Sequence, residues 1–354
     1  LSLLGSAYLG HGNAARGLEY LEKAIALAPD SVNIRKQLAF GHLALGEEEL
    51  AMGELQTAVD LNQGLPQSDV LQVMIHLRNK DFDSALTVAE TLTNKMPDSP
   101  VPDNLKGAAH LGKEDHKSAR DAYEAALKIQ PDFMPAHINL AQLDLLANDS
   151  AAAKGRYQKV LSYDEGNLKA LLGLAVLTNR EGRADETEQW LKQAQHHHPK
   201  STQLALMLVA YYQRQGKTLE ALDLASTLAT THHRDPQVLK TLALIQVQAG
   251  KDQAALTTLR SLVKVAPQSP EAHYKLAMLL LKTEKYNTAR KRLQQALTLQ
   301  PDHPPAQLAL GRLDIAGKNL DAALGISRDL KQAHPDAYFG YELEGDILFS
   351  RQDF

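Results

Sequence analysis

The sequence has no cysteine, few aromatic side chains and no long apolar run. Without cysteine the chain has no disulfide, no thiolate nucleophile and no cysteine-ligated metal. A bilayer-spanning helix needs about 20 consecutive apolar residues, and no stretch of this sequence approaches that length. The formal net charge is −4, from 38 basic and 42 acidic residues. This mild acidity argues against nucleic-acid binding, which needs a concentrated positive field.

The remaining composition is that of a chain that folds around a core. Hydrophobic residues make up 44% and charged residues 23% of the sequence, which excludes a disordered chain. The length of 354 residues would by itself suggest two or three globular domains. An internal repeat changes that expectation.

Three residue types recur along the whole chain in one common, fixed period. One series holds Pro29, Pro97, Pro131, Pro199, Pro267, Pro301 and Pro335, with Gln63, Glu165 and His233 in its remaining places. A second series holds Gly12, Gly46, Gly182, Gly216 and Gly250. A third holds Ala51, Ala85, Ala119, Ala153, Ala221, Ala255, Ala289 and Ala323. Chance does not keep three residue types in one register over this length, so the chain is an array of similar units.

Each unit reads as a helix–turn–helix hairpin. About 12 helix-forming residues precede the glycine and about 14 lie between it and the proline, as in residues 33–45 before Gly46 and 185–198 before Pro199. Glycine permits the left-handed residue that ends one helix, and proline stops the next. No segment shows the alternation of a strand. The pattern predicts an all-α fold of about ten 34-residue hairpins plus one extra helix.

The repeat resembles that of the tetratricopeptide repeat (TPR) family, which has the same unit length of about 34 residues. The unit around Asn139-Leu140-Ala141 carries the family's small residues, and a later unit carries Leu276-Ala277, Tyr286, Ala289, Leu293, Ala296 and Pro301. The resemblance implies a right-handed superhelical solenoid that forms a single domain over residues 1–354. In the family's register both ends of the chain fall inside a unit, so we expect a fragment of a larger protein, truncated at both ends.

In TPR proteins the first helix of each unit lines a concave groove that binds extended peptides or helices. The resemblance places ten partner-binding residues in that groove: Phe40, Met74, Arg78, Asn139, Arg180, Arg214, Lys275, Met278, Lys282 and Arg312. The set combines apolar and basic side chains, which suits a protein or peptide partner with apolar and acidic residues. The alternative is that the apolar row packs against adjacent helices while the charges are solvated.

Histidines form two groups. His42, His76 and His110 occupy the same place in three successive units, and each is either part of a pH-sensitive ladder or a half-buried aromatic substitute with one hydrogen bond. Residues 196–198 and 232–233 are histidine tracts at the ends of two successive second helices. They either trap a transition metal or lie solvated where positive charge suits the helix dipole.

The search for catalytic signatures finds no HExxH, GxSxG or GxGxxG motif. We therefore expect no enzyme activity, no cofactor and no metal, and the leading hypothesis is a protein–protein interaction scaffold. The alternative from another class is a substrate-docking or targeting arm of a larger enzyme, such as a glycosyltransferase. A purely structural spacer is the third hypothesis.

Within the TPR family, residues 3–9, 104–113 and 136–144 are similar to segments of the TPR-repeat lipoproteins of bacterial exosortase (PEP-CTERM) and exopolysaccharide systems. That resemblance implies a role in envelope polysaccharide export or protein sorting, in the periplasm or at the outer membrane of a Gram-negative bacterium. A lipid anchor would then lie outside this sequence. A cytoplasmic location remains the alternative.

Overall fold

The computed structural model describes residues 1–61 and 66–351, and within these ranges it contains 21 α-helices and no strand. The prediction of an all-α fold is confirmed. The chain divides into two compact units, unit 1 (Leu1–Trp190) and unit 2 (Leu191–Phe354), and α12 (Ala184–His197) contains the point of division. The single domain over residues 1–354 stays a prediction.

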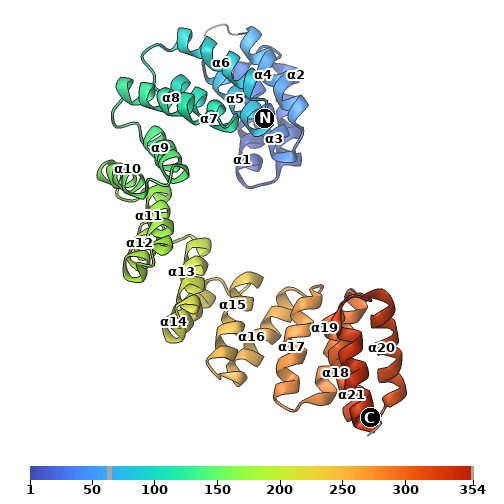
Figure 1. The fold of residues 1–354 in the computed structure, drawn as a ribbon. Helices are drawn as coiled ribbons and strands as arrows, with labels where there is room; N and C mark the ends of the chain where they lie inside the picture. The colour runs from blue at the N-terminus through green and yellow to red at the C-terminus, as the bar shows by residue number, and fades with distance from the viewer. Residues whose placement is uncertain (62–65, 352–354) are drawn as a thin grey trace. The chain divides into compact units, whose positions relative to one another are not determined.

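Helices follow one another as hairpins in both units (Figure 1). In unit 1 they are α1 (Ser2–Gly10), α2 (Ala14–Leu27), α3 (Val32–Leu45), α4 (Glu48–Leu61), α5 (Pro66–Arg78), α6 (Phe82–Lys95), α7 (Val101–Gly112), α8 (His116–Ile129), α9 (Met134–Leu146), α10 (Ser150–Tyr163) and α11 (Leu168–Arg180). In unit 2 they are α13 (Thr202–Arg214), α14 (Thr218–Thr231), α15 (Pro236–Gln248), α16 (Asp252–Val265), α17 (Pro270–Lys282), α18 (Tyr286–Leu299), α19 (Pro304–Ala316), α20 (Leu320–Ala333) and α21 (Tyr338–Arg351). Odd-numbered helices are the A helices of the repeat and even-numbered ones the B helices, and consecutive helices pack against each other from α1 to α11 and from α13 to α21.

The turn from A helix to B helix contains a left-handed residue in every repeat. The five glycines predicted for this role have φ between 69° and 78°. The other five repeats use non-glycine residues with φ of 59° or 60°: Lys80, Glu114, Asn148, Glu284 and Lys318. The next residue's N–H reaches back to the helix, as in the 2.9 Å bond from Asp81 N to His76 O. This is the Schellman arrangement, which satisfies carbonyls that the helix end leaves unpaired.

The prolines end the B helices as predicted. The helix stops two residues before the proline, at Leu27 before Pro29 and at Lys95 before Pro97. A proline cannot donate the backbone hydrogen bond that a further turn would need. The corresponding position at Gln63 lies outside the described residues.

The alanine series forms the contact between A and B helices. All eight alanines of the series are fully buried. Elsewhere the close approach needs glycine: a Cβ on Gly107 would lie 2.4 Å from Cε1 of Tyr123. Burial of that ring raises the pKa of Tyr123 to about 12. Small residues therefore let neighbouring helices interlock around a continuous core within each unit.

The histidine series is half-buried, as the structural interpretation predicted. The Nδ1 atoms of His42, His76 and His110 lie 2.8, 3.1 and 3.7 Å from a carboxylate oxygen of Glu47, Asp81 and Asp115, respectively. Each pair joins an A helix to the start of its own B helix. The pH-sensitive ladder stays a prediction.

Candidate partner-binding groove

One repeat position on the A helices carries exposed apolar side chains in both units. They are Phe40, Met74, Val176, Leu244 and Met278, with exposed fractions between 39% and 54%. If these side chains packed against adjacent helices, they would be buried. Surface apolar side chains that recur on one helix face mark a binding surface more often than isolated ones do.

One hollow of this surface in unit 2 lies over α15 and α17. A pocket of about 420 Å³ there is lined by Lys240, Ala243, Leu244, Val247, Leu259, Tyr274, Lys275, Met278, Leu279 and Lys282. A second pocket, of about 540 Å³, lies over α17, α19 and α21 and shares Tyr274 and Met278 with the first. The two together form what we call the unit 2 groove. Its floor is apolar, and lysines stand along one half of it.

The start of each A helix sets which residues face this groove. Asp235 caps α15 by accepting hydrogen bonds from the N–H groups of Gln237 and Val238, at 2.8 and 3.3 Å. Ser269 caps α17 through the N–H of Ala272, at 3.2 Å. Proline follows the cap in both helices, where its missing N–H costs nothing. Asp235 and Ser269 are one repeat apart, so the two helices begin at equivalent places and present equivalent positions to the groove.

The lysines of the groove differ in how they are paired. Lys275 binds Glu271 at 2.9 Å and Lys282 binds Asp252 at 2.8 Å. Lys240 has no salt-bridge partner among the residues that the structure describes. Burial opposes the charge on Glu271, but Lys275, followed by Lys240 and His303, outweighs it and lowers the pKa of this carboxyl. The carboxylate therefore stays ionised beside the lysines.

Arg312 on α19 is already bound within unit 2. Its guanidinium donates to Asp346 at 2.8 Å and to Glu342 at 2.7 Å, both on α21. The bond to Asp346, with that to Glu342, raises the pKa of Arg312. The two carboxylates are four residues apart on one helix, so the pair illustrates how an arginine of this surface holds a helical acidic segment. Binding of a partner by Arg312 stays a prediction, since a partner would compete with these two groups.

Tyrosines line the other half of the unit 2 groove and were absent from the predicted set. Tyr274, Tyr286 and Tyr338 border the second pocket with Phe339. Burial, with the charges of Glu271 and Tyr338, raises the pKa of Tyr274, so its hydroxyl stays neutral. The repeat register could have predicted Tyr274, because this residue has the same position in α17 that Lys240 has in α15.

In unit 1, Phe40 and Met74 line a smaller pocket. It measures about 380 Å³ and lies over α3 and α5, with Lys36 and Val70 also on its wall. Arg78, at the end of α5, is exposed. Here the structure brings two of the predicted residues into one pocket.

Four predicted residues lie apart from these pockets, and the exposed Arg78 is one of them. Asn139 on α9 donates a hydrogen bond of 2.9 Å to Oδ1 of Asn104 on α7, so its amide links two A helices. Arg180 in unit 1 and Arg214 in unit 2 are exposed at the ends of α11 and α13. Neither arginine has an ion-pair partner within the described ranges. The structure thus assembles Lys275, Met278, Lys282 and Arg312 into one groove and leaves these four residues outside the pockets.

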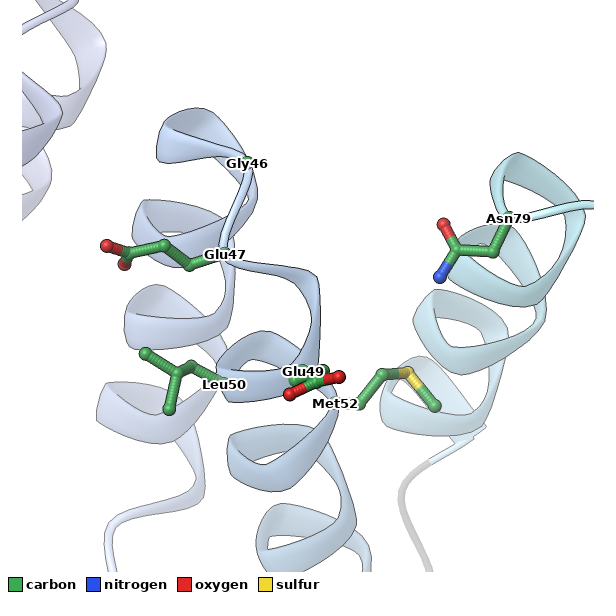
Figure 2. A pocket seen from close by; sticks show the side chains of 6 residues that line it. All are labelled: Gly46, Glu47, Glu49, Leu50, Met52 and Asn79. Atoms are coloured by element: carbon green, nitrogen blue, oxygen red, sulfur yellow. The ribbon is translucent and has the colours of Figure 1, made fainter.

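Another hollow in unit 1 is a weaker candidate (Figure 2). It measures about 800 Å³ and is lined by Gly46, Glu47, Glu49, Leu50, Met52 and Asn79. Figure 2 shows Met52 and Asn79 pointing into the space between α4 and α5, whereas Glu47 and Leu50 point away from it. The carboxylate of Glu47 is held by His42. The polar groups do not converge on one point, as a ligand site requires.

No metal site appears in the described part of the chain. No group of three or more histidine, aspartate or glutamate residues there is arranged to hold an ion. The rings of His196 and His197 instead meet edge to face, with centroids 5.5 Å apart. Nor does any helix within residues 1–61 and 66–351 have the length and apolarity to cross a membrane.

Three family models, each described as a tetratricopeptide repeat, match the chain. They cover residues 2–66, 104–133, 145–211, 240–286 and 280–340, well over half of the sequence. This chain belongs to the tetratricopeptide repeat family. A search of the curated proteins finds no match.

Several solved structures are similar to parts of the chain. YrrB, described as a TPR protein with an unusual peptide-binding site, is 20% identical and aligns over 54% of this chain and 98% of its own, with a TM-score of 0.43. TTC0263 of Thermus thermophilus is 18% identical, over 52% of this chain and 100% of its own, with a TM-score of 0.45. PilW, described as a type IV pilus biogenesis factor, is 18% identical, over 58% and 96%, with a TM-score of 0.47.

Proposed function

We propose that this chain is a non-catalytic scaffold that binds an extended or helical protein segment along its A helices, with the unit 2 groove as the principal site. The observation that carries the proposal is the exposed floor formed by Leu244 and Met278 between Lys240, Lys275 and Lys282. Membership of a family of interaction modules supports the same conclusion.

The chemistry of the groove favours an apolar segment with acidic residues. Covering the exposed floor with apolar side chains removes both surfaces from water, which is favourable by roughly 25 cal/mol per Å² of apolar area. The lysine pairs to Glu271 and Asp252 are partly exposed, and such pairs contribute only about 0–1 kcal/mol. An incoming carboxylate therefore displaces or shares these lysines at little cost.

We further propose a role in envelope polysaccharide export or protein sorting, with the protein in the periplasm or associated with the outer membrane. The support is the likeness of residues 3–9, 104–113 and 136–144 to TPR lipoproteins of exosortase systems. Fractionation of the source cells tests this part directly. Recovery of the protein only in the cytosol would contradict it.

The binding function is tested with two charge-reversed baits in an extract of the source organism. Lys240→Glu with Lys282→Glu reverses the groove, whereas Arg260→Glu with Lys291→Glu reverses two exposed positions on B helices of the same unit. A protein retained by the wild type and by the B-helix variant, but lost from the groove variant, is then purified and titrated against all three. Equal affinities for the two variants would overturn the proposal.

A further inference from the structure

Two pockets, one in each unit, are built from the same repeat positions. The pocket of unit 1 is lined by Lys36, Phe40, Val70 and Met74, and six repeats later the pocket over α15 and α17 is lined by Lys240, Leu244, Tyr274 and Met278. Each residue of the second set occupies the place of its counterpart in the first. The two pockets therefore have equivalent linings. We call the pocket of unit 1 seat 1 and the pocket over α15 and α17 seat 2.

Both seats have a basic residue at each end. Lys36 stands near the start of α3 and Lys240 near the start of α15. At the far end, Arg78 is the last residue of α5 and Lys282 the last of α17, again in equivalent positions. Of the ten pairs of consecutive A helices, only α3 with α5 and α15 with α17 carry basic residues at both places.

The two basic positions of a seat lie on neighbouring A helices. Within the repeat they are eight residues apart, which at 1.5 Å per residue is about 12 Å along the helix axes. Neighbouring helices add roughly 10 Å across the axes, so the two positions are roughly 15 Å apart. The floor between them is exposed and apolar: Phe40 and Met74 in seat 1, Leu244 and Met278 in seat 2.

Three of the four basic groups, Lys36, Lys240 and Lys282, are open to a further carboxylate. Lys36 and Lys240 have no salt bridge to any residue of the described ranges. Lys282 contacts Asp252, but its side chain is 52% exposed, and an exposed pair of this kind holds its lysine weakly. Seat 2 also contains Lys275 where seat 1 has Leu71, so seat 2 is the more basic of the two.

We propose that each seat binds one protein segment in which two acidic residues roughly 15 Å apart flank a large apolar side chain, and that the chain therefore holds two such segments at once. The spacing corresponds to about ten residues of a helix or to about four or five residues of an extended strand. The inference rests on the proposed scaffold function and adds the chemistry and number of the segments. Two joined segments in one partner would bind with an avidity that neither has alone.

The test uses defined peptides. The probes are fluorescein-labelled twelve-residue peptides with a central Leu-Phe pair flanked by two glutamates, at separations of four to ten residues, and matched peptides with lysine in place of glutamate. Calorimetry of the full chain should give two glutamate peptides bound per chain, and no binding of the lysine peptides. Lys36→Glu with Arg78→Glu and, separately, Lys240→Glu with Lys282→Glu should each leave one site, whereas Arg260→Glu with Lys291→Glu keeps two.

Phe40→Ala and Leu244→Ala provide a second readout, since both side chains are exposed and neither holds the core. Each should weaken one of the two sites about tenfold and leave the other unchanged. A single site removed by one variant alone would overturn the two-seat inference, as would equal binding of both peptide sets or no binding at all. The scaffold function would still stand if its purified partner is lost on reversal of Lys240 and Lys282 alone.

Discussion

The B helices of the two units begin differently, although they share one repeat. In unit 1, Asp81, Asp115 and Asp149 cap α6, α8 and α10 with side-chain hydrogen bonds to backbone N–H groups. In unit 2, Lys251 and Lys285 take that position before α16 and α18 and make no such bond. The position five residues earlier changes with it: it is His76 and His110 in unit 1, and Gln246 and Leu280 in unit 2.

The capping position of the B helix and the A-helix position five residues earlier act as a pair. An aspartate there caps the B helix and also faces the histidine of the A helix, so one carboxylate serves two helices. Where lysine replaces the aspartate, the A-helix residue has another partner. Gln246, for example, accepts a 2.8 Å hydrogen bond from the Thr258 hydroxyl. These hairpins of unit 1 are therefore joined by a charged pair at the turn, whereas the hairpin of α15 and α16 in unit 2 is joined by a neutral hydrogen bond.

The largest effect expected is from Asp144→Ala in unit 1. The Asp144 carboxylate is almost fully buried and accepts from Arg120 at 2.7 Å and from Arg156 at 2.6 Å. Asp144→Ala removes two charge-assisted hydrogen bonds from arginines that are 34% and 25% exposed, which we expect to cost about 3 kcal/mol. Asp314→Ala in unit 2 removes a pair to Arg290 alone and should cost less. Hydrogen exchange of α9 and α19 measures both, and equal losses would contradict the ranking.

Overpacking the A–B contact comes next and should affect the two units alike. Ala153→Leu in unit 1 and Ala289→Leu in unit 2 replace fully buried members of the same series. Each should destabilise its own hairpin by about 1–3 kcal/mol, because the helices cannot separate without loss of packing. Local hydrogen exchange should accelerate around each site. Unchanged exchange in α9 and α10 of the Ala153→Leu protein would mean that the register is wrong.

Exchanging the capping residues should change the stability of the two units in opposite directions. Asp149→Ala removes the bond to Ala152 N, at 2.9 Å, and should destabilise α10 by about 1 kcal/mol. Lys285→Asp supplies a missing cap to α18 and should stabilise unit 2 by a similar or smaller amount. Denaturant unfolding followed by exchange in each unit gives both values. A loss on Lys285→Asp would show that this lysine has a structural role of its own.

Reversing the charge of one exposed arginine in each unit tests partner binding while leaving the stability of the fold unchanged. Arg180→Glu and Arg214→Glu should weaken partner capture several-fold while helix content and melting temperature stay unchanged, because neither side chain has an ion-pair partner in the described residues. Circular dichroism and titration of a captured partner measure the two properties. If both variants capture the partner normally and Arg260→Glu with Lys291→Glu weakens capture, the binding site is on the B helices.

The smallest effect expected is a difference in acid sensitivity. The hydrogen bonds from Ser84, with smaller contributions that include His76, lower the pKa of Asp81 below its ordinary value of 3.8, and Ser118 and His110 do the same for Asp115. Stability from these carboxylates is present above pH 3.8 and is lost as the pH falls through their lower folded pKa. Exchange at the starts of α6 and α8 should thus rise only below that pH. Asp81→Asn with Asp115→Asn should abolish the pH dependence.

The hairpin array was predictable because helix ends depend on local chemistry. Gly46 and Pro97 predicted a turn and a helix end that the structure contains. Lys80 and Glu114 adopt the same left-handed turn without glycine, because the surrounding hairpin holds the backbone there at a modest cost in strain. No residue type in the sequence marks such a turn, and only the period of the repeat locates it.

The candidate site was predictable in part, for a different reason. The register placed Met278 and Lys282 on the right face, since helix phase follows from position in the repeat. It could not tell that Arg312 is engaged by Glu342 and Asp346, because that depends on side-chain reach between α19 and α21. It also missed Tyr338, which joins the groove only because α21 packs beside α19.

The most direct test of the scaffold account is photo-crosslinking from inside the unit 2 groove. A benzophenone amino acid at Met278 reports contacts of the groove floor, and the same group at Lys291 on α18 is the matched control. We predict that a partner protein crosslinks to position 278 and not to position 291, and that Lys240→Glu with Lys282→Glu abolishes the product. A partner that crosslinks at position 291, or at position 278 regardless of the lysines, would contradict the account.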